Sequence, residues 1–280
     1  MTDTDLKLEH LIRLLKSLDP IAIGFSGGVD STFLCALAYK ENIKVLAITV
    51  HTLFQPQEEI QRAQQLASDL AIPHYVEKID IQQEPFFIKN PKNRCYHCKY
   101  LLFSTIKKIA ADNKIFNVID GTNADDQALH RPGTKALQDL GIHSPLKDVG
   151  LTKQEIQHLS KDMQLPTWNL PPESCLATRI PYGTSITHKM LKEIEQAESI
   201  IKSYNVTLVR IRHQGIAAVI EVLPRYIRTV SKHAQDITKS LNALGFIEVY
   251  LNPQGYQSGK PYERNHKKNL TLLSTGEDHA

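Results

Sequence analysis

The sequence predicts an α/β protein with a doubly wound parallel sheet, followed by a smaller C-terminal α+β domain. Two observations lead to this class. Four runs of buried-strand type alternate with helical patterns, at 21–25, 44–51, 74–80 and 115–121. Such alternation favours parallel strands joined by right-handed crossovers. Prolines and glycines then exclude regular structure over much of 164–186, and a different pattern follows this stretch.

The remaining elements follow from apolar periodicity. In the first half we expect helices at 5–18, from the first turn to about 40, at 56–71 and at 99–112. In the second half we expect a helix at 187–203, strands at 206–213 and 217–223, a helix at 224–244 and a strand at 247–252. The predicted domains are therefore 1–165, an irregular cysteine-bearing loop at 166–186, and 187–257. The polar residues 258–280 lack apolar periodicity, which predicts a mobile tail.

Composition excludes several classes of protein. The 280 residues are 41% hydrophobic and 22% charged, which is typical of soluble globular proteins. A net charge of +3 is too weak to indicate a nucleic-acid partner. The sequence shows neither a secretory signal pattern nor an apolar run of membrane-spanning length, and four cysteines do not make a disulfide framework. We therefore expect a cytoplasmic protein that binds neither membranes nor nucleic acid.

The most informative stretch is Ser26-Gly27-Gly28-Val29-Asp30-Ser31, which links the first predicted strand to a helix. Paired glycines let the backbone approach an anion, and the helix presents unpaired N–H groups to it. The two serines add hydroxyl donors, and Asp30 is suited to a Mg²⁺ ion that accompanies phosphates. The turn resembles the SGGxDS pyrophosphate loop of N-type ATP pyrophosphatases. The alternative is an ordinary glycine-rich turn between a strand and a helix.

Other polar residues follow the second and fourth predicted strands. Ligands in parallel sheets lie beyond the carboxyl ends of the strands. Thr49, Gly121 and Asn123 are therefore candidate nucleotide-binding residues, and Asp125 or Asp126 is a candidate second Mg²⁺ ligand. An Asn-x-Asp-Asp run is also typical of a turn and a helix N-cap, and this alternative stays open.

The cysteines are the second informative feature. Cys95 and Cys98 form a C-x-x-C pair, and Cys175 lies in the irregular loop near Arg179, which favours its thiolate and is itself a candidate cofactor-binding residue. Three thiolates suit a catalytic zinc ion with a bound water, or a cubane iron–sulfur cluster with one iron free of cysteine. Spacing alone does not decide between the two. Cys35 lies in an apolar helical stretch and is expected to be a core residue.

With these residues in view, the chain closely resembles the LarE family of ATP-dependent sulfur transferases, through about residue 260. The fold implied is the adenine nucleotide alpha hydrolase-like (PP-loop) type. Besides 26–31, the resemblance lies in 94–99 (RCYHCK), 121–126 (GTNADD), 131–133 (RPG), 144–146 (SPL), 175–183 (CLATRIPYG) and 209–212 (VRIR). It implies adenylation of the carboxylates of pyridinium-3,5-biscarboxylic acid mononucleotide by ATP and Mg²⁺. Sulfur then displaces AMP and gives the thiocarboxylates of the nickel-pincer nucleotide cofactor.

The resemblance also implies a sulfur source. Family members with one cysteine in the late loop give up its sulfur, whereas members with a C-x-x-C pair resemble cluster-dependent enzymes. Cys95, Cys98 and Cys175 match the second type, which implies a [4Fe-4S] cluster, a catalytic role for Cys175 and an external sulfide source. The family also forms homo-oligomers, so we expect one here. A departure from the family pattern lies at 255–263, where GYQSGKPYE lacks the usual arginine.

Two more candidate residues lie in the C-terminal domain. Arg210 and Arg212 alternate along a predicted strand, so both guanidinium groups can converge on a substrate phosphate or carboxylate. Glu221 on the partner strand is placed to orient them. The alternative is a solvated, charged strand face.

Rival functions remain. A tRNA thiolase of the same fold also combines SGGxDS with C-x-x-C and a third cysteine, although this chain shows no dense Lys/Arg stripe or added RNA-binding module. Another rival is a non-catalytic ATP- or zinc-binding regulatory protein, which predicts no turnover of ATP to AMP.

Overall fold

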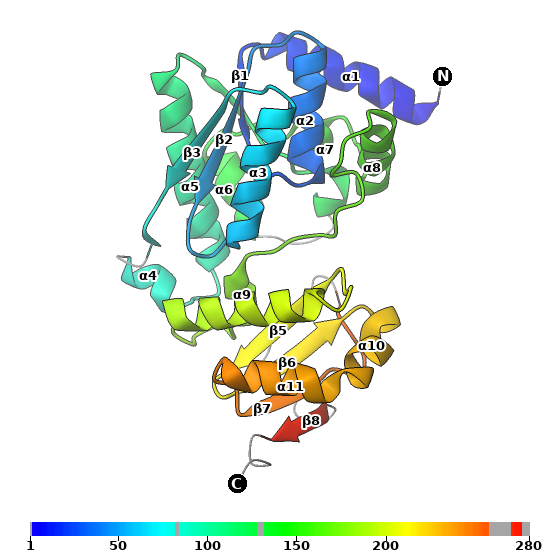
Figure 1. Ribbon diagram of the computed structural model, residues 1–280. Helices are drawn as coiled ribbons and strands as arrows, with labels where there is room; N and C mark the ends of the chain where they lie inside the picture. Colours follow the sequence, from blue (N-terminus) through cyan, green and yellow to red (C-terminus); the bar gives the residue numbers. More distant parts are fainter. Residues whose placement is uncertain (1, 82–83, 128–131, 258–269, 276–280) are drawn as a thin grey trace. The chain divides into compact units, whose positions relative to one another are not determined.

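The computed structural model describes residues 2–81, 84–127, 132–257 and 270–275 (Figure 1). The chain separates into two compact units. The first comprises Met1–Ile81 and Asn93–Glu173, and the second comprises Gln82–Lys92 and Ser174–Ala280. The short segment before residue 93 thus belongs with the C-terminal part of the chain. Asn90 explains this, because its Nδ2 donates to the Pro181 carbonyl at 2.9 Å and its own carbonyl accepts from the Gly183 N–H.

The first unit contains a four-stranded sheet in which every pair of neighbours is parallel. Its strands are β1 (Ile21–Gly24), β2 (Val45–His51), β3 (His74–Lys78) and β4 (Asn117–Ile119). Their order is β3-β2-β1-β4, so the chain runs outward from β1 to one edge and then returns to add β4 on the other side. The predicted doubly wound parallel sheet is confirmed.

Helices cover both faces of this sheet. The described elements are α1 (Asp3–Ser17), α2 (Val29–Lys40), α3 (Gln57–Asp69), α5 (Arg94–Asp112), α6 (Pro132–Asp139), the short α7 (Pro145–Asp148), α8 (Lys153–Asp162) and the 3-10 turn η2 (Ala124–Gln127). Alternate side chains of β1 explain the two layers. Ile21 and Ile23 pack with α2, α3 and α8, whereas Ala22 packs with α5 on the other face.

Several elements differ from the prediction. Helix α5 begins at Arg94 rather than at residue 99, so the C-x-x-C pair lies within its first turns. Helices α6, α7 and α8 were not predicted, because their stretches are short and polar. Helix α8 is nevertheless well specified locally, since Thr152 and Glu155 form a reciprocal capping box.

The second unit carries a mixed four-stranded sheet in the order β5-β6-β7-β8. Its elements are α4 (Pro85–Ile88), the 3-10 turns η3 (Leu176–Arg179) and η4 (Pro224–Tyr226), α9 (His188–Lys202), β5 (Val209–Gln214), β6 (Ala217–Val222), α10 (Ile227–Lys232), α11 (Ala234–Ala243), β7 (Glu248–Leu251) and β8 (Thr271–Thr275). Strands β5 and β6 form the predicted antiparallel hairpin, and β6 pairs with β7 in parallel. The predicted α+β class of the smaller C-terminal domain is thereby confirmed.

Two predictions in this unit need correction. The single helix expected at 224–244 is divided into η4, α10 and α11, with a break at His233. Periodicity does not reveal the break, because the buried Val230 and Ile237 lie seven residues apart, as they would in a continuous helix. Within the predicted tail 258–280, Thr271–Thr275 forms β8 and pairs with β7. Residues 258–269 and 276–280 of that tail lie outside the described residues, as does Arg131 of the RPG segment.

None of the helices within the described residues combines the length and the apolar character that crossing a membrane would require.

Candidate active site

The predicted phosphate loop forms a tight turn between β1 and α2. Gly27 has a φ of 69°, a conformation that favours glycine. A Cβ at Gly27 would lie 3.0 Å from the Ala63 Cα, so the loop packs directly on the backbone of α3. The hydroxyls of Ser26 and Ser31 lie 3.2 Å apart, and Ser31 Oγ accepts from the Ser26 N–H at 3.3 Å. Both hydroxyls are therefore held at the start of α2, where unpaired N–H groups favour an anion.

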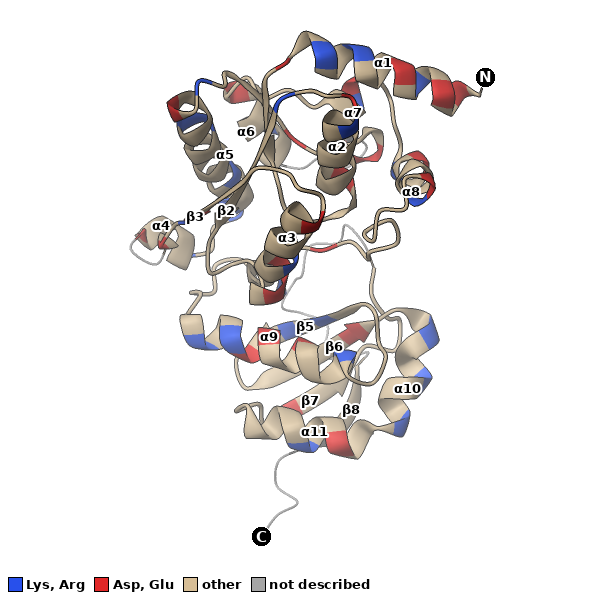
Figure 2. Cartoon of the chain, turned by 45° about the horizontal axis from the view of Figure 1, so that its top comes forward, with Lys and Arg blue, Asp and Glu red and all other residues tan. Residues whose placement is uncertain are grey.

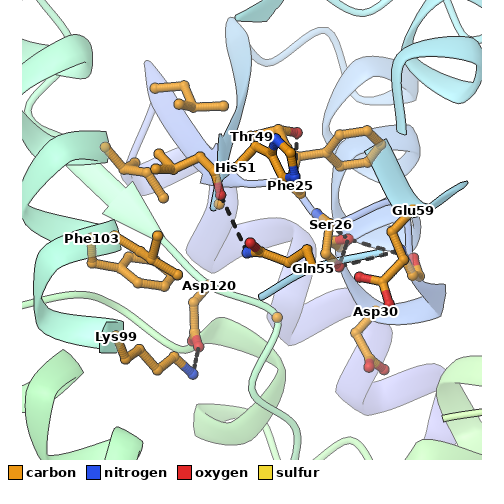
Figure 3. A pocket seen from close by; sticks show the side chains of 18 of the residues that line it. Phe25, Ser26, Asp30, Thr49, His51, Gln55, Glu59, Lys99, Phe103 and Asp120 are labelled. Atoms are coloured by element: carbon orange, nitrogen blue, oxygen red, sulfur yellow. Dashed lines mark hydrogen bonds and ion pairs between the residues drawn. The ribbon is translucent and has the colours of Figure 1, made fainter. Parts of the chain in front are cut away.

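A cavity of about 410 Å³ lies beside this loop at the carboxyl edge of the sheet (Figure 3). Its volume is in the range of small-molecule sites. Part of its wall is apolar and comes from the residue after β1, from β2 and from α5: Phe25, Ile48, Val50, Leu102, Phe103 and Ile106. Another part is polar, and Figure 3 shows Ser26, Asp30 and Glu59 together there. An apolar wall beside an anion-binding turn suits a nucleotide, with its base on the wall and its phosphates in the turn.

Carboxylates dominate the charge of this cavity. The described lining residues include five of them: Asp30, Glu59, Asp120, Asp126 and Glu173. Three of the five pair with the side chain of a lysine or an arginine. Lys153 Nζ lies 2.6 Å from Asp30, Lys99 Nζ lies 3.5 Å from Asp120, and Arg62 pairs with Glu173. A polyphosphate can enter such a pocket only with added positive charge, which is the role that Mg²⁺ plays for nucleotides.

Asp30 lies where a metal ligand is expected, at the first turn of α2. Burial raises the pKa of its carboxyl group, and the neighbouring Lys153 opposes this rise. Its Oδ2 accepts from Lys153, whereas its buried Oδ1 has no hydrogen-bond partner within the described residues. A buried carboxylate oxygen without a donor fits a bound cation. The residues present therefore suit Mg²⁺.

The other predicted nucleotide-binding residues have mixed surroundings. Thr49 lines the cavity, but its hydroxyl donates to the Phe25 carbonyl at 2.6 Å and lies 2.8 Å from His74 Nε2. It thus links β2 to its neighbours. Gly121 also lines the cavity, and a Cβ there would lie 3.2 Å from Asp30 Cβ, so glycine lets the end of β4 approach α2 closely.

Asn123 forms the turn that the sequence offered as the alternative to a role in binding nucleotide or Mg²⁺. Its Oδ1 accepts from the Asp125 N–H at 3.0 Å, and its own N–H donates to Asp126 Oδ2 at 3.2 Å. These bonds shape the 3-10 turn η2. Asp126 lines the cavity, whereas Asp125 accepts from the Lys153 N–H at the start of α8.

The structure divides the three candidate metal ligands between the two units. Cys95 and Cys98 lie one turn apart on α5 and are half-buried, so their thiols share a face of that helix. Cys175 belongs to the second unit, immediately before η3. Among the residues that the structure describes, no group of three or more His, Cys, Asp or Glu side chains is gathered to hold a metal ion. Cys35 is fully buried in α2, as expected, and burial raises the pKa of its thiol.

Arg179 shapes the backbone around Cys175. Its guanidinium pairs with Glu198 of α9 through two hydrogen bonds of 2.8 and 3.0 Å, and both side chains are buried. The remaining edge donates to the carbonyl oxygens of Ser174 and Cys175 at 2.5 and 3.0 Å. Arg179 therefore fixes the cysteine-bearing turn through main-chain oxygens.

Arg210 and Arg212 lie on β5, whose basic positions are blue in Figure 2, and they are not a solvated strand face. Their exposed fractions are 6% and 7%. Arg212 pairs with Glu221 at 2.8 Å and donates to the Thr178 carbonyl at 3.1 Å. Arg210 lies over the Tyr256 ring, and burial, together with the charge of Arg179, lowers the pKa of its guanidinium. Burial excludes the solvated strand face, and anion binding by the two arginines stays a prediction.

Comparisons with known proteins identify the family. The sequence model of the PP-loop domain matches residues 2–130, which contain the phosphate loop. An uncharacterized protein of Synechocystis is 35% identical over 257 residues, which cover 91% of this chain and 96% of the relative. An uncharacterized protein of Methanocaldococcus jannaschii is 31% identical over 258 residues, which cover 90% and 98%. The chain belongs to the same family as these two relatives, and its residues 2–130 match the PP-loop domain.

A third relative carries a functional name. The pyridinium-3,5-bisthiocarboxylic acid mononucleotide synthase of Lactiplantibacillus plantarum is 29% identical over 272 residues, which cover 96% of this chain and 98% of the relative. These matches extend well beyond the PP-loop domain. They support an ATP-using enzyme of the PP-loop type, as the sequence predicted, and the domain supports ATP binding with Mg²⁺.

The surroundings of the phosphate loop include residues that the sequence did not indicate. Asp120 is buried at the carboxyl end of β4, accepts from Ser144 Oγ at 2.7 Å and pairs with Lys99. Asp120 directly follows a buried strand. Because ligands lie beyond the carboxyl ends of parallel strands, this position could have indicated Asp120 from the sequence, as it indicated Thr49. Lys153 and Arg62 gave none, because they reach the loop from helices far from it in the sequence.

Proposed function

We propose that this PP-loop protein is an ATP-dependent sulfur transferase that acts on the carboxylates of pyridinium-3,5-biscarboxylic acid mononucleotide. One observation carries the proposal. The phosphate-loop pocket belongs to a chain that aligns along nearly its whole length with a relative named for the bisthiocarboxylic acid product. The mixed pocket, with an apolar wall and an anion-binding turn, supports the ATP half of this reaction.

In the first step, a substrate carboxylate oxygen attacks the α-phosphorus of ATP and pyrophosphate leaves. The turn at 26–31 would hold the departing pyrophosphate through its N–H groups and serine hydroxyls. Asp30 would bind Mg²⁺, which offsets the charge of the phosphates next to the cavity's carboxylates. Arg210 and Arg212 would bind the substrate's phosphate or second carboxylate, as buried guanidinium groups do well.

In the second step, sulfur attacks the acyl carbon of the adenylate and AMP leaves, which gives the thiocarboxylate. We propose that Cys95, Cys98 and Cys175 hold a [4Fe-4S] cluster. Thiolates are the ligands that such clusters require, and the first unit supplies two of them on one helix face. When bound, the cluster would carry the transferred sulfide on the iron that has no cysteine ligand. An external sulfide source would then restore it, so that the enzyme turns over.

The activity is tested by incubating the anaerobically purified protein with ATP, Mg²⁺, sulfide and the dicarboxylate mononucleotide. We expect AMP, pyrophosphate and thiocarboxylate to form together, and only when the mononucleotide is present. Bulk tRNA serves as the competing acceptor. AMP formation that requires tRNA and does not change when the mononucleotide is added would establish a tRNA thiolase instead. If no AMP forms with either acceptor, the proposed adenylation is refuted.

The sulfur source is tested by iron and acid-labile sulfide analysis. We expect about four irons per chain in the wild type, and their loss in Cys95→Ala, Cys98→Ala and Cys175→Ala. Cys35→Ala is the matched control, because this buried cysteine in α2 should leave the iron content unchanged. An iron content that is unchanged in Cys175→Ala would refute the three-thiolate cluster. Cys175 would then be the candidate sacrificial donor, detectable by its conversion to dehydroalanine.

A further inference from the structure

Arg62 joins the phosphate loop to the chain segment that leads to Cys175. From α3, its Nε donates to the Gly27 carbonyl at 3.3 Å, and its Nη2 pairs with the Glu173 carboxylate. Glu173 precedes Cys175 by two residues. The Arg62 and Glu173 side chains are 26% and 32% exposed, and Glu173 lines the cavity beside the loop.

The position of Arg62 relative to the loop is fixed by packing. The neighbouring Ala63 is fully buried, and its backbone would lie only 3.0 Å from a Cβ placed on Gly27. Contact this close leaves no space for α3 to shift relative to the loop. The guanidinium therefore starts from a backbone held against the loop, within hydrogen-bond distance of the Gly27 carbonyl.

Glu173 is the part of this arrangement that a polyphosphate would displace. Its carboxylate lines the cavity, where it adds to the negative charge that an incoming nucleotide meets. Guanidinium binds phosphate oxygens through paired, charge-assisted hydrogen bonds. A partly exposed ion pair favours the closed segment by about fivefold or less, which is enough to slow hydrogen exchange but can be overcome by a bound polyphosphate.

We propose that Arg62 is a polyphosphate-binding residue that exchanges partners during the reaction. With the loop empty, Arg62 holds Glu173 and so anchors the segment before Cys175. With ATP or pyrophosphate in the loop, Arg62 binds the phosphates and releases Glu173. Adenylation is thereby coupled to the freedom of the cysteine-bearing segment. This inference rests on the proposed use of the loop for ATP.

Hydrogen exchange of the full-length protein, followed by mass spectrometry, tests the release. The probes are Mg²⁺ with pyrophosphate and Mg²⁺ with ATP, and the readout is exchange in peptides covering 166–175. We expect faster exchange there when either ligand is bound. In Glu173→Gln and Arg62→Gln, exchange should be fast without ligand and should not rise further. Arg13→Gln is the matched control, because Arg13 pairs with Glu9 on the exposed face of α1.

Ligand affinity in the same samples tests the exchange of partners. Glu173→Gln should tighten ATP binding by up to about fivefold, because the competing carboxylate charge is gone. Arg62→Gln should weaken it by about tenfold or more. Either variant tests the pair if the other fails to fold.

The outcomes separate the two proposals. Ligand that binds the wild type without changing exchange at 166–175, or that slows it, would overturn the coupling and leave the ATP site intact. Unchanged ATP affinity in Arg62→Gln would overturn its role as a phosphate ligand. If neither ATP nor pyrophosphate binds the wild type, the proposed function and this inference both fail.

Discussion

Gly27→Ala is the substitution that most directly tests the phosphate loop. Two costs add at this position. An L-residue at a φ of 69° costs about 1–2 kcal/mol. The new Cβ would also lie 3.0 Å from the Ala63 Cα, where ordinary contact begins at 3.4 Å, and overpacking of this kind costs about 1–3 kcal/mol. We therefore expect the free energy of unfolding to fall by about 2–5 kcal/mol in total.

Gly141→Ala is the matched control for this prediction. Gly141 has a φ of 65° in the same unit, but no atom lies within 4 Å of the position that a Cβ would take there, so only the backbone cost of about 1–2 kcal/mol applies. Denaturant unfolding measures both variants, and equilibrium binding of ATP follows. We expect Gly27→Ala to be less stable than Gly141→Ala and to lose ATP affinity, whereas Gly141→Ala keeps it. Equal stability of the two variants would refute the packing of the loop on α3.

Other predictions concern the second unit and the capping of α8. Arg179→Met should lower the free energy of unfolding by about 3–5 kcal/mol, because it leaves the buried Glu198 without its cation. Adding Glu198→Gln should recover part of this loss in denaturant unfolding, and no recovery would contradict the cause. Glu155→Gln should lower the melting temperature at neutral pH. Burial alone would raise the pKa of Glu155, but hydrogen bonds from Lys7 and the α8 cap lower it to about 2. This stabilisation is complete above the ordinary pKa of 4.5 and is lost as the pH falls towards 2, so the two melting temperatures should converge there. A difference that persists at that pH would refute the role of the charge.

The parallel sheet was predictable because its signals are local. Each buried strand is a short apolar run, and the helices between the strands carry their own periodicity. The phosphate loop was equally visible, since Ser26, Gly27 and Asp30 lie within five consecutive residues and the turn needs those residue types. The break at His233 and the edge strand β8 were not visible, because neither changes the apolar period of its surroundings.

The candidate site was predictable only where one segment supplies it. Arg62 and Lys153 reach the phosphate loop from α3 and α8, and Glu173 lines the pocket from a third segment, so their pairing depends on how helices pack on the sheet. Arg210 and Arg212 show the same limit. The two arginines occupy alternate positions of one predicted strand, but the sequence was compatible with a solvated strand face as well as with a buried anion site. Burial to 6% and 7% excludes the solvated face.

The sequence by itself thus determined the fold class, the loop at 26–31 and the choice of Cys95, Cys98 and Cys175 as candidate ligands. These depend on residue types and short-range order. Tertiary structure alone decided which charges meet. It set Lys153 against Asp30, placed Arg62 between the loop and Glu173, and directed Arg179 to Glu198. Ion pairs act over a few ångströms between residues that can be a hundred positions apart, so only the packed chain brings them together.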